Sequence, residues 1–176
     1  MIRDTVREFM QVEVRPHVKE WERAEYFPAE AIRKLGEMGC CGMLMPEEWG
    51  GPGLDSISYV LMLGEVAKVF TAMSTALSVT NSAVQLPLLA HGTEEQKKKY
   101  LRRLASGEIL GAFCLTEPAA GSDAAGIQST AVRCGGADSG VGGGAGSGAG
   151  IKASATGYRL NGVKSWVTNG SCAGVY

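Results

Sequence analysis

Two short segments carry residue types that could hold a flat, polar ligand. The first, residues 113–123 (FCLTEPAAGSD), ends a short apolar strand predicted from Ile109 to Leu115 and breaks at Pro118 into a turn of small residues. The turn offers hydroxyls, a carboxylate and backbone N–H groups with little side-chain bulk around them. An anionic or polar cofactor could therefore approach the backbone closely there.

The second segment, residues 164–170 (KSWVTNG), has the composition of another strand. Alternate side chains of a strand lie on opposite faces, so Lys164, Trp166 and Thr168 would share one face. An aromatic ring beside a hydroxyl suits stacking against a planar ring and hydrogen bonding to its edge.

Together these segments resemble the flavin-binding strands of the acyl-CoA dehydrogenase family. In that family Phe-x-Leu-[Thr/Ser]-Glu-Pro-x-x-Gly-Ser-Asp is followed by Lys-x-Trp-[Ile/Val]-[Thr/Ser]-Asn. Residues 45–55 (MPEEWGGPGLD) are similar to the family's Pro-Glu-x-x-Gly-Gly-x-Gly-Leu signature. The three segments stand in the family's order, and the resemblance covers nearly the whole chain except residues 135–155.

The resemblance implies FAD as the cofactor and an acyl-CoA thioester as the substrate. Thr116 and Thr168 would then lie at the flavin edge, Trp166 against its rings, and Gly121 and Ser122 near the phosphates. Ser122 would also border the acyl-CoA. The flavin-binding residues implied in this way are Phe113, Cys114, Leu115, Thr116, Gly121, Ser122, Trp166, Val167 and Thr168.

No catalytic residue is assigned within the chain. Glu117 invites assignment as the base, but the family keeps a glutamate there and takes its base from a C-terminal four-helix domain. The base is therefore expected beyond Tyr176, and the chain is interpreted as the front part of such an enzyme, inactive by itself. The resemblance also implies an electron-transfer flavoprotein as electron acceptor and a homotetramer in the full-length form.

Two alternatives stay open. An acyl-CoA oxidase or another flavin enzyme of the superfamily would pass its electrons to oxygen. A truncated, non-catalytic binding or interaction protein would keep the fold without the chemistry. Among dehydrogenases, residues 78–82 (SVTNS) favour a short- or branched-chain type, acting in fatty-acid β-oxidation or branched-chain amino-acid catabolism.

Composition excludes several other classes of protein. The net charge of −1 implies no nucleic-acid partner, and no apolar run approaches the roughly 20 residues of a membrane span. Five cysteines without a Cys-x-x-Cys pair favour free thiols, and His17 and His91 lack the spacing of metal ligands. No targeting segment is visible, so we expect the mitochondrial matrix of a eukaryote or the cytoplasm of a bacterium.

The elements that position these segments change character near residue 107. Apolar residues recur every three or four positions from Val6 to Trp21, which predicts a helix. Pro16 lies inside this pattern, so we expect a kink or a break into two helices near Arg15. Further helices are expected to start at Pro28, after Asp55, near Ala72 and after Thr93. From Ile109 strand residues dominate, and Asn161-Gly162 predicts a hairpin turn between strands at 158–160 and 163–166. We therefore predict an α+β fold, with an N-terminal all-α helical bundle over residues 1–107 and an incomplete antiparallel β domain over 108–176.

Residues 135–150 differ from the rest of the chain and from the family pattern. Nine of these sixteen residues are glycine, and Val141 is the only large apolar residue among them. Such a segment cannot bury enough surface to offset its ordering entropy, which predicts a disordered loop. We predict that a short turn in its place leaves folding and flavin affinity nearly unchanged, because loop closure costs only ~0.6 kcal/mol per doubling of length. Thermal unfolding and FAD titration measure both properties. A large loss of stability would show that the glycines have a structural role.

Overall fold

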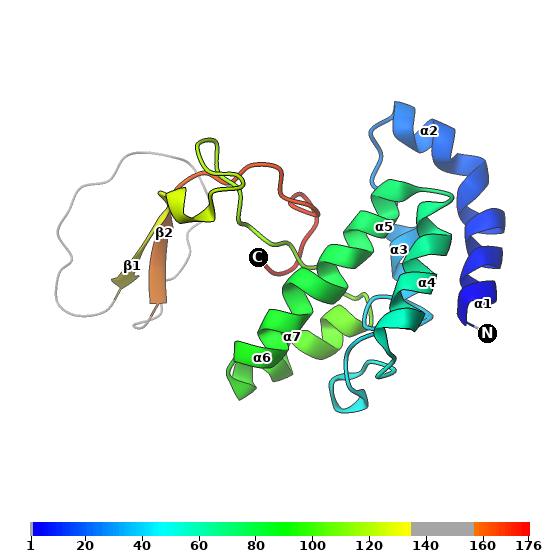
Figure 1. The fold of residues 1–176 in the computed structure, drawn as a ribbon, viewed down its shortest axis with the longest axis horizontal. Coiled ribbons are helices and arrows are strands. Elements are labelled where there is room, and N and C mark those ends of the chain that lie inside the picture. The colour runs from blue at the N-terminus through cyan, green and yellow to red at the C-terminus, as the bar shows by residue number, and fades with distance from the viewer. Residues whose placement is uncertain (1, 135–156) are drawn as a thin grey trace. The chain divides into compact units, whose positions relative to one another are not determined.

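The structure, a computed structural model, describes residues 2–134 and 157–176 and divides the chain into two compact units (Figure 1). The helical unit extends to Cys114 and also includes Val167–Tyr176, whereas the strand unit is Leu115–Trp166. Residues 108–114 and 167–176 thus group with the helices, outside the β domain expected from 108 onward. The glycine-rich segment at 135–150 lies outside the described residues. Within the described ranges, no helix is long and apolar enough to span a membrane.

The helical unit is built from α-helices joined by short turns of other helix types. Its α-helices are α1 (Ile2–Phe9), α2 (Val18–Arg23), α3 (Ala29–Glu37), α4 (Ser56–Ala67), α5 (Thr71–Ser78), α6 (Gln85–His91) and α7 (Glu94–Ala105). A π-helical turn at Val79–Val84 joins α5 to α6, so that the two continue as one rod in Figure 1. Other short helical turns are Met10–Val14, Arg15–His17, Glu47–Trp49 and, in the strand unit, Ala124–Gly126.

Local sequence signals account for where these helices start and stop. The Asp55 carboxylate accepts a hydrogen bond from the Ser58 N–H at 2.7 Å and so caps α4, and Thr93 and Gln96 form the predicted capping box of α7. The expected break at Pro16 is confirmed, because α1 and α2 are separate helices. Pro28 is the residue that precedes α3 and not its first residue.

A buried amide links two distant parts of the helical core. Asn81 lies in the turn between α5 and α6 and is fully enclosed. Its side chain accepts from the Met43 N–H at 2.9 Å and donates to the carbonyls of Cys40 at 2.9 Å and Leu77 at 3.0 Å. Since buried backbone groups need partners, Asn81 fixes the loop after α3 against α5.

A buried carboxylate joins α1 to α4. Both oxygens of Glu65 accept hydrogen bonds from the Arg7 guanidinium, at 2.9 and 3.0 Å, and Lys68 donates to the same group at 2.9 Å. Hydrogen bonds from Arg7 and then Lys68 lower the pKa of Glu65 to about 2. The group therefore stays ionised in the folded unit.

The last described segment is held to the helices by one side chain and two backbone bonds. The Asn169 amide donates to the carbonyls of Ala76 at 3.2 Å and Gly111 at 2.9 Å. The Gly174 N–H donates to the Leu110 carbonyl, and the Ala112 N–H donates to the Val175 carbonyl, both at 2.9 Å. These bonds explain why residues 167–176 belong to the helical unit. Asn169 has φ +64°, a conformation that asparagine tolerates better than most residues.

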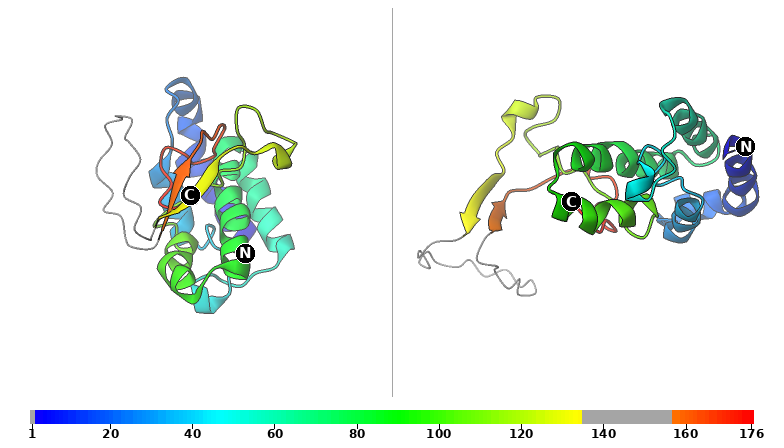
Figure 2. Two further views of the ribbon diagram at one scale, coloured as in Figure 1. Left: turned by 90° about the vertical axis from the view of Figure 1, so that its left-hand side faces the viewer. Right: turned by 90° about the horizontal axis from the view of Figure 1, so that it is seen from below.

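The strand unit contains two paired strands among its described residues. Strand β1 (Thr130–Cys134) pairs antiparallel with β2 (Gly157–Asn161), with Thr130 opposite Asn161 and Cys134 opposite Gly157 (Figure 2). The structure thus agrees with the expected α+β class and with an antiparallel sheet.

Three local strand predictions are wrong. Residues 109–115 form only an isolated bridge between Gly111 and Val175, and residues 163–168 form no strand. The Asn161-Gly162 hairpin is absent because Asn161 stays in β2 opposite Thr130 and does not adopt the positive φ that such a turn requires. A strand exists only where a neighbouring segment completes its hydrogen bonds. Alternation of apolar and polar residues in the sequence does not show whether such a neighbour is present.

We predict that Glu65→Gln lowers stability near neutral pH and flattens its pH dependence. The folded-state pKa of about 2 lies below the ordinary value of 4.5, so ionised Glu65 stabilises the folded unit above pH 4.5. That stabilisation is lost as the pH falls from 4.5 through about 2. Urea unfolding on both sides of pH 4.5 measures the effect, with Glu95→Gln, an exposed glutamate of α7, as control. Parallel pH profiles for wild type and Glu65→Gln would contradict it.

We also predict that Asn169→Ala destabilises the helical unit by roughly 2–4 kcal/mol, since it removes the hydrogen bonds to the Ala76 and Gly111 carbonyls and places alanine at a left-handed φ. Asn169→Gly removes the same hydrogen bonds but adopts this φ without strain, so it should cost less. Urea unfolding followed by far-ultraviolet circular dichroism measures both variants. Equal losses would show that the backbone conformation contributes nothing.

Candidate functional site

The strand unit brings together one residue range from each of the two predicted flavin segments. The Ser165 N–H donates to the Thr116 carbonyl at 2.9 Å, and the Lys164 ammonium donates to the Leu115 carbonyl at 3.0 Å. Residues 115–117 and 164–165 therefore lie side by side although they are far apart in the sequence. We call these two ranges, 115–117 and 164–165, the local framework. It contains Thr116 and directly precedes Trp166.

Glu117 lies at the centre of this framework. Its carboxylate accepts hydrogen bonds from the Lys164 ammonium at 2.8 Å, the Ser129 N–H at 3.0 Å and the Gln128 N–H at 2.8 Å. These donors, Lys164 first, lower the pKa of Glu117 to about 2. A buried carboxylate that is held ionised by three donors is a poor proton acceptor. The geometry agrees with the interpretation of Glu117 as a structural residue and not the catalytic base.

The side chains next to this framework fit a flat aromatic cofactor. Trp166 is 93% exposed and Leu115 is 38% exposed, so an indole and an apolar side chain are free to be covered by a ring system. Trp166 has φ +56°, which is unusual for a residue with a side chain. Thr116, which follows Leu115 in the sequence, is half-buried and carries a hydroxyl group. The residues present therefore fit the isoalloxazine part of a flavin.

The turn after Pro118 fits a phosphate group. Gly121 and Ser122 are both exposed, and a Cβ added at Gly121 would meet no atom within 4 Å. The turn closes through the Ala120 N–H, which donates to the Glu117 carbonyl at 3.1 Å. Small residues in an open turn let backbone N–H groups approach an anion.

The nine predicted flavin residues are divided between the two units. Leu115, Thr116, Gly121, Ser122 and Trp166 belong to the strand unit. The others, Phe113, Cys114, Val167 and Thr168, belong to the helical unit. Within the helical unit, the bonds from Asn169 to Gly111 and from Ala112 to Val175 bring the chain near Phe113 to the segment that contains Thr168.

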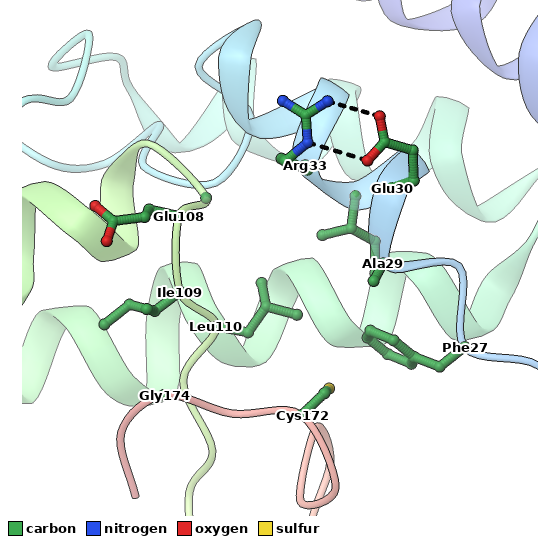
Figure 3. Close-up of a pocket in the computed structure, with 11 residues that line it drawn as sticks. Phe27, Ala29, Glu30, Arg33, Glu108, Ile109, Leu110, Cys172 and Gly174 are labelled. Atoms are coloured by element: carbon green, nitrogen blue, oxygen red, sulfur yellow. Dashed lines mark hydrogen bonds and ion pairs between the residues drawn. The ribbon is translucent and has the colours of Figure 1, made fainter.

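A separate pocket of about 250 Å³ lies in the helical unit (Figure 3). Phe27, Ile109 and Leu110 supply apolar walls, and Cys172 lies at one side. Arg33 at the pocket is already paired with Glu30 and Glu37 on α3. Burial of part of the group raises the pKa of the Cys172 thiol. None of the nine predicted flavin residues lines this pocket.

In the described part of the chain, no cluster of His, Cys, Asp and Glu could hold a metal ion.

Sequence reasoning missed two residues that shape this region. Lys164 and Asn169 begin and end the pattern Lys-x-Trp-Val-Thr-Asn, yet the residue-by-residue interpretation gave neither a role. Their partners lie 47 and 93 residues away in the sequence, for Glu117 and Ala76 respectively. The local signal is a cation and an amide at the two ends of residues 165–168.

Comparison with known proteins gives a consistent result. The model of the acyl-CoA dehydrogenase N-terminal domain matches residues 1–108. The chain is 39% identical to an acyl-CoA dehydrogenase of Bacillus subtilis, and the match covers 100% of this chain and 41% of the relative. It is 37% identical to a short-chain specific acyl-CoA dehydrogenase of Clostridium acetobutylicum, again with 100% and 41% covered. The chain thus spans about 40% of the length of these relatives.

The fold agrees with a solved structure as well. The acyl-CoA dehydrogenase of Bacillus anthracis, determined in complex with FAD, superimposes with a TM-score of 0.80 at 36% identity. The match covers 98% of this chain and 27% of that one. The domain match spans the helices, and the relatives align through both flavin segments to the end of the chain. The chain belongs to the acyl-CoA dehydrogenase family.

Proposed function

We propose that the protein containing this chain is a FAD-dependent acyl-CoA dehydrogenase that converts acyl-CoA thioesters to enoyl-CoA. The observation that carries the proposal is the pairing of residues 115–117 with residues 164–165, which leaves Trp166 exposed next to two predicted flavin contacts. The family membership and the FAD-bound relative support the same cofactor. Bound FAD would supply the hydride acceptor, which no amino-acid side chain provides.

In this proposal the residues of this chain bind the flavin and orient it relative to the acyl-CoA. Trp166 would pack against the flavin rings, and the hydroxyls of Thr116 and Thr168 would donate to the flavin edge. The N–H groups of Gly121 and Ser122 would contact the phosphates, and Ser122 would also border the acyl-CoA. The backbone from Phe113 to Leu115 offers donors and acceptors to the pyrimidine side.

The catalytic base lies outside this chain in the proposal. Glu117 is held ionised by three donors, and we place the base on a glutamate of a C-terminal helical domain, as the family resemblance implies. The same resemblance supports a homotetramer and an electron-transfer flavoprotein as the electron acceptor.

The substrate class and cellular role are narrower proposals. The relative from Clostridium acetobutylicum that is short-chain specific supports a short-chain acyl-CoA as substrate. We place the reaction in fatty-acid β-oxidation or branched-chain amino-acid catabolism. The compartment would be the cytoplasm in a bacterium or the mitochondrial matrix in a eukaryote.

We predict that the full-length protein purifies with FAD, whereas the 176-residue chain alone holds FAD weakly. The chain supplies contacts to one side of the flavin, so its hydrogen bonds would compete with water and each would return little net energy. Flavin absorbance after gel filtration measures retention. In the full-length protein, Trp166→Ala should weaken retention, and Thr168→Ala should slow flavin reduction by acyl-CoA more than it weakens binding.

Tyr158→Ala provides the matched control for Trp166→Ala. Tyr158 is an exposed aromatic residue of β2 in the same unit, but it lies outside both flavin segments. Its removal should leave flavin retention unchanged. A full-length protein that binds no flavin, or that keeps it unchanged without Trp166 and Thr168, would contradict the proposed function.

A further inference from the structure

Glu117 and Lys164 make an ion pair among the proposed flavin contacts, although neither touches the flavin in the proposed function. The Lys164 ammonium lies 2.8 Å from Glu117 Oε1 and 3.0 Å from the Leu115 carbonyl oxygen. The Glu117 side chain is 6% exposed and the Lys164 side chain is 25% exposed. A pair so enclosed is screened far less by water than a surface ion pair.

The pair holds three chain segments at one point. Glu117 Oε2 accepts from the Gln128 N–H at 2.8 Å, and Oε1 accepts from the Ser129 N–H at 3.0 Å, directly before β1. Lys164 then ties the segment after β2 to the same carboxylate. All three segments belong to the strand unit.

The pair also fixes the register between the two flavin segments. Lys164 bonds to the Leu115 carbonyl, and the next residue, Ser165, bonds through its N–H to the Thr116 carbonyl at 2.9 Å. Two successive residues of one segment are thus bonded to two successive residues of the other. Sliding by one residue would break the Ser165–Thr116 backbone bond and would move Lys164 relative to both of its acceptors.

Trp166 follows this double anchor directly. Its φ of +56° is unfavourable for a residue with a side chain, and such a conformation persists only when the surrounding chain holds it. The residue is 93% exposed, so packing of its ring does not supply the restraint. The anchors at Lys164 and Ser165 are the adjacent contacts that can do so.

We propose that Glu117 and Lys164 are positioning residues for the flavin: their ion pair sets the register between Thr116 and Trp166 before the cofactor arrives. This inference rests on the proposed function. A surface that is already ordered binds its ligand without a further ordering cost, so the pair should strengthen FAD affinity without contacting FAD.

The test uses the full-length native protein and its variants Lys164→Met, Glu117→Gln and Lys164→Arg. FAD is titrated into each apoprotein to obtain its Kd, and the visible circular dichroism of the bound flavin reports the geometry around the ring. The melting temperature of each apoprotein is measured separately. Lys97→Met is the matched control, because Lys97 is a largely buried lysine that pairs with Glu94 at 3.1 Å on α7.

We expect Lys164→Met and Glu117→Gln to raise the Kd for FAD on the order of tenfold and to change the flavin circular dichroism. Lys164→Arg, which keeps a cation near both acceptors, should recover most of the affinity. Lys97→Met should leave the Kd and the spectrum as in wild type.

Several outcomes would overturn the proposal. Variants with a lower melting temperature but an unchanged Kd and spectrum would show that the pair only stabilises the fold. A Lys164→Arg protein no better than Lys164→Met would exclude a role for the ion pair. If Lys164→Met does not fold, the nearly isosteric Glu117→Gln carries the same comparison. A wild-type protein without FAD affinity would overturn the proposed function and this inference with it, whereas wild-type affinity in every variant would overturn this inference alone.

Discussion

Backbone groups removed from water must find hydrogen-bond partners, and in this chain side chains meet that need where regular structure does not. Glu117 pairs with the N–H groups of Gln128 and Ser129 next to a small sheet. Asn81 does the same for the loop after α3, and Asn169 does it for the Gly111 carbonyl. Each of these side chains fixes a segment that has no strand or helix of its own.

Each of the two units contains a buried carboxylate that is held ionised in the same way. Glu65 and Glu117 are both buried, and each is surrounded by cationic or N–H donors. Burial alone would raise their pKa values, but the donors outweigh it and hold both groups ionised. Each unit therefore has a negative charge that organises nearby chain segments. This arrangement also removes Glu117 from acid–base chemistry.

Local signals predicted the helices well and the strands poorly. The caps at Asp55 and Thr93 and the break at Pro16 depend on residues within one helical turn, so the sequence shows them directly. The strands expected at 109–115 and 163–168 depend on neighbours elsewhere in the chain, and the alternation of residues does not reveal whether a neighbour is there. The positive φ of Trp166 and the partners of Lys164 were hidden for the same reason. The flavin residues themselves came from the order and spacing of three motifs, which a family resemblance preserves even when the local structure is irregular.

The exposure of Trp166 makes the strand unit optically distinct. Trp21 and Trp49 are partly enclosed in the helical unit, whereas Trp166 is 93% exposed in the strand unit. A water-exposed indole emits at longer wavelength than an enclosed one, so the red edge of the intrinsic fluorescence belongs mainly to Trp166. FAD that binds against this indole would quench the long-wavelength part of the emission first. The protein thus carries its own label at the surface proposed for FAD, with no dye attached.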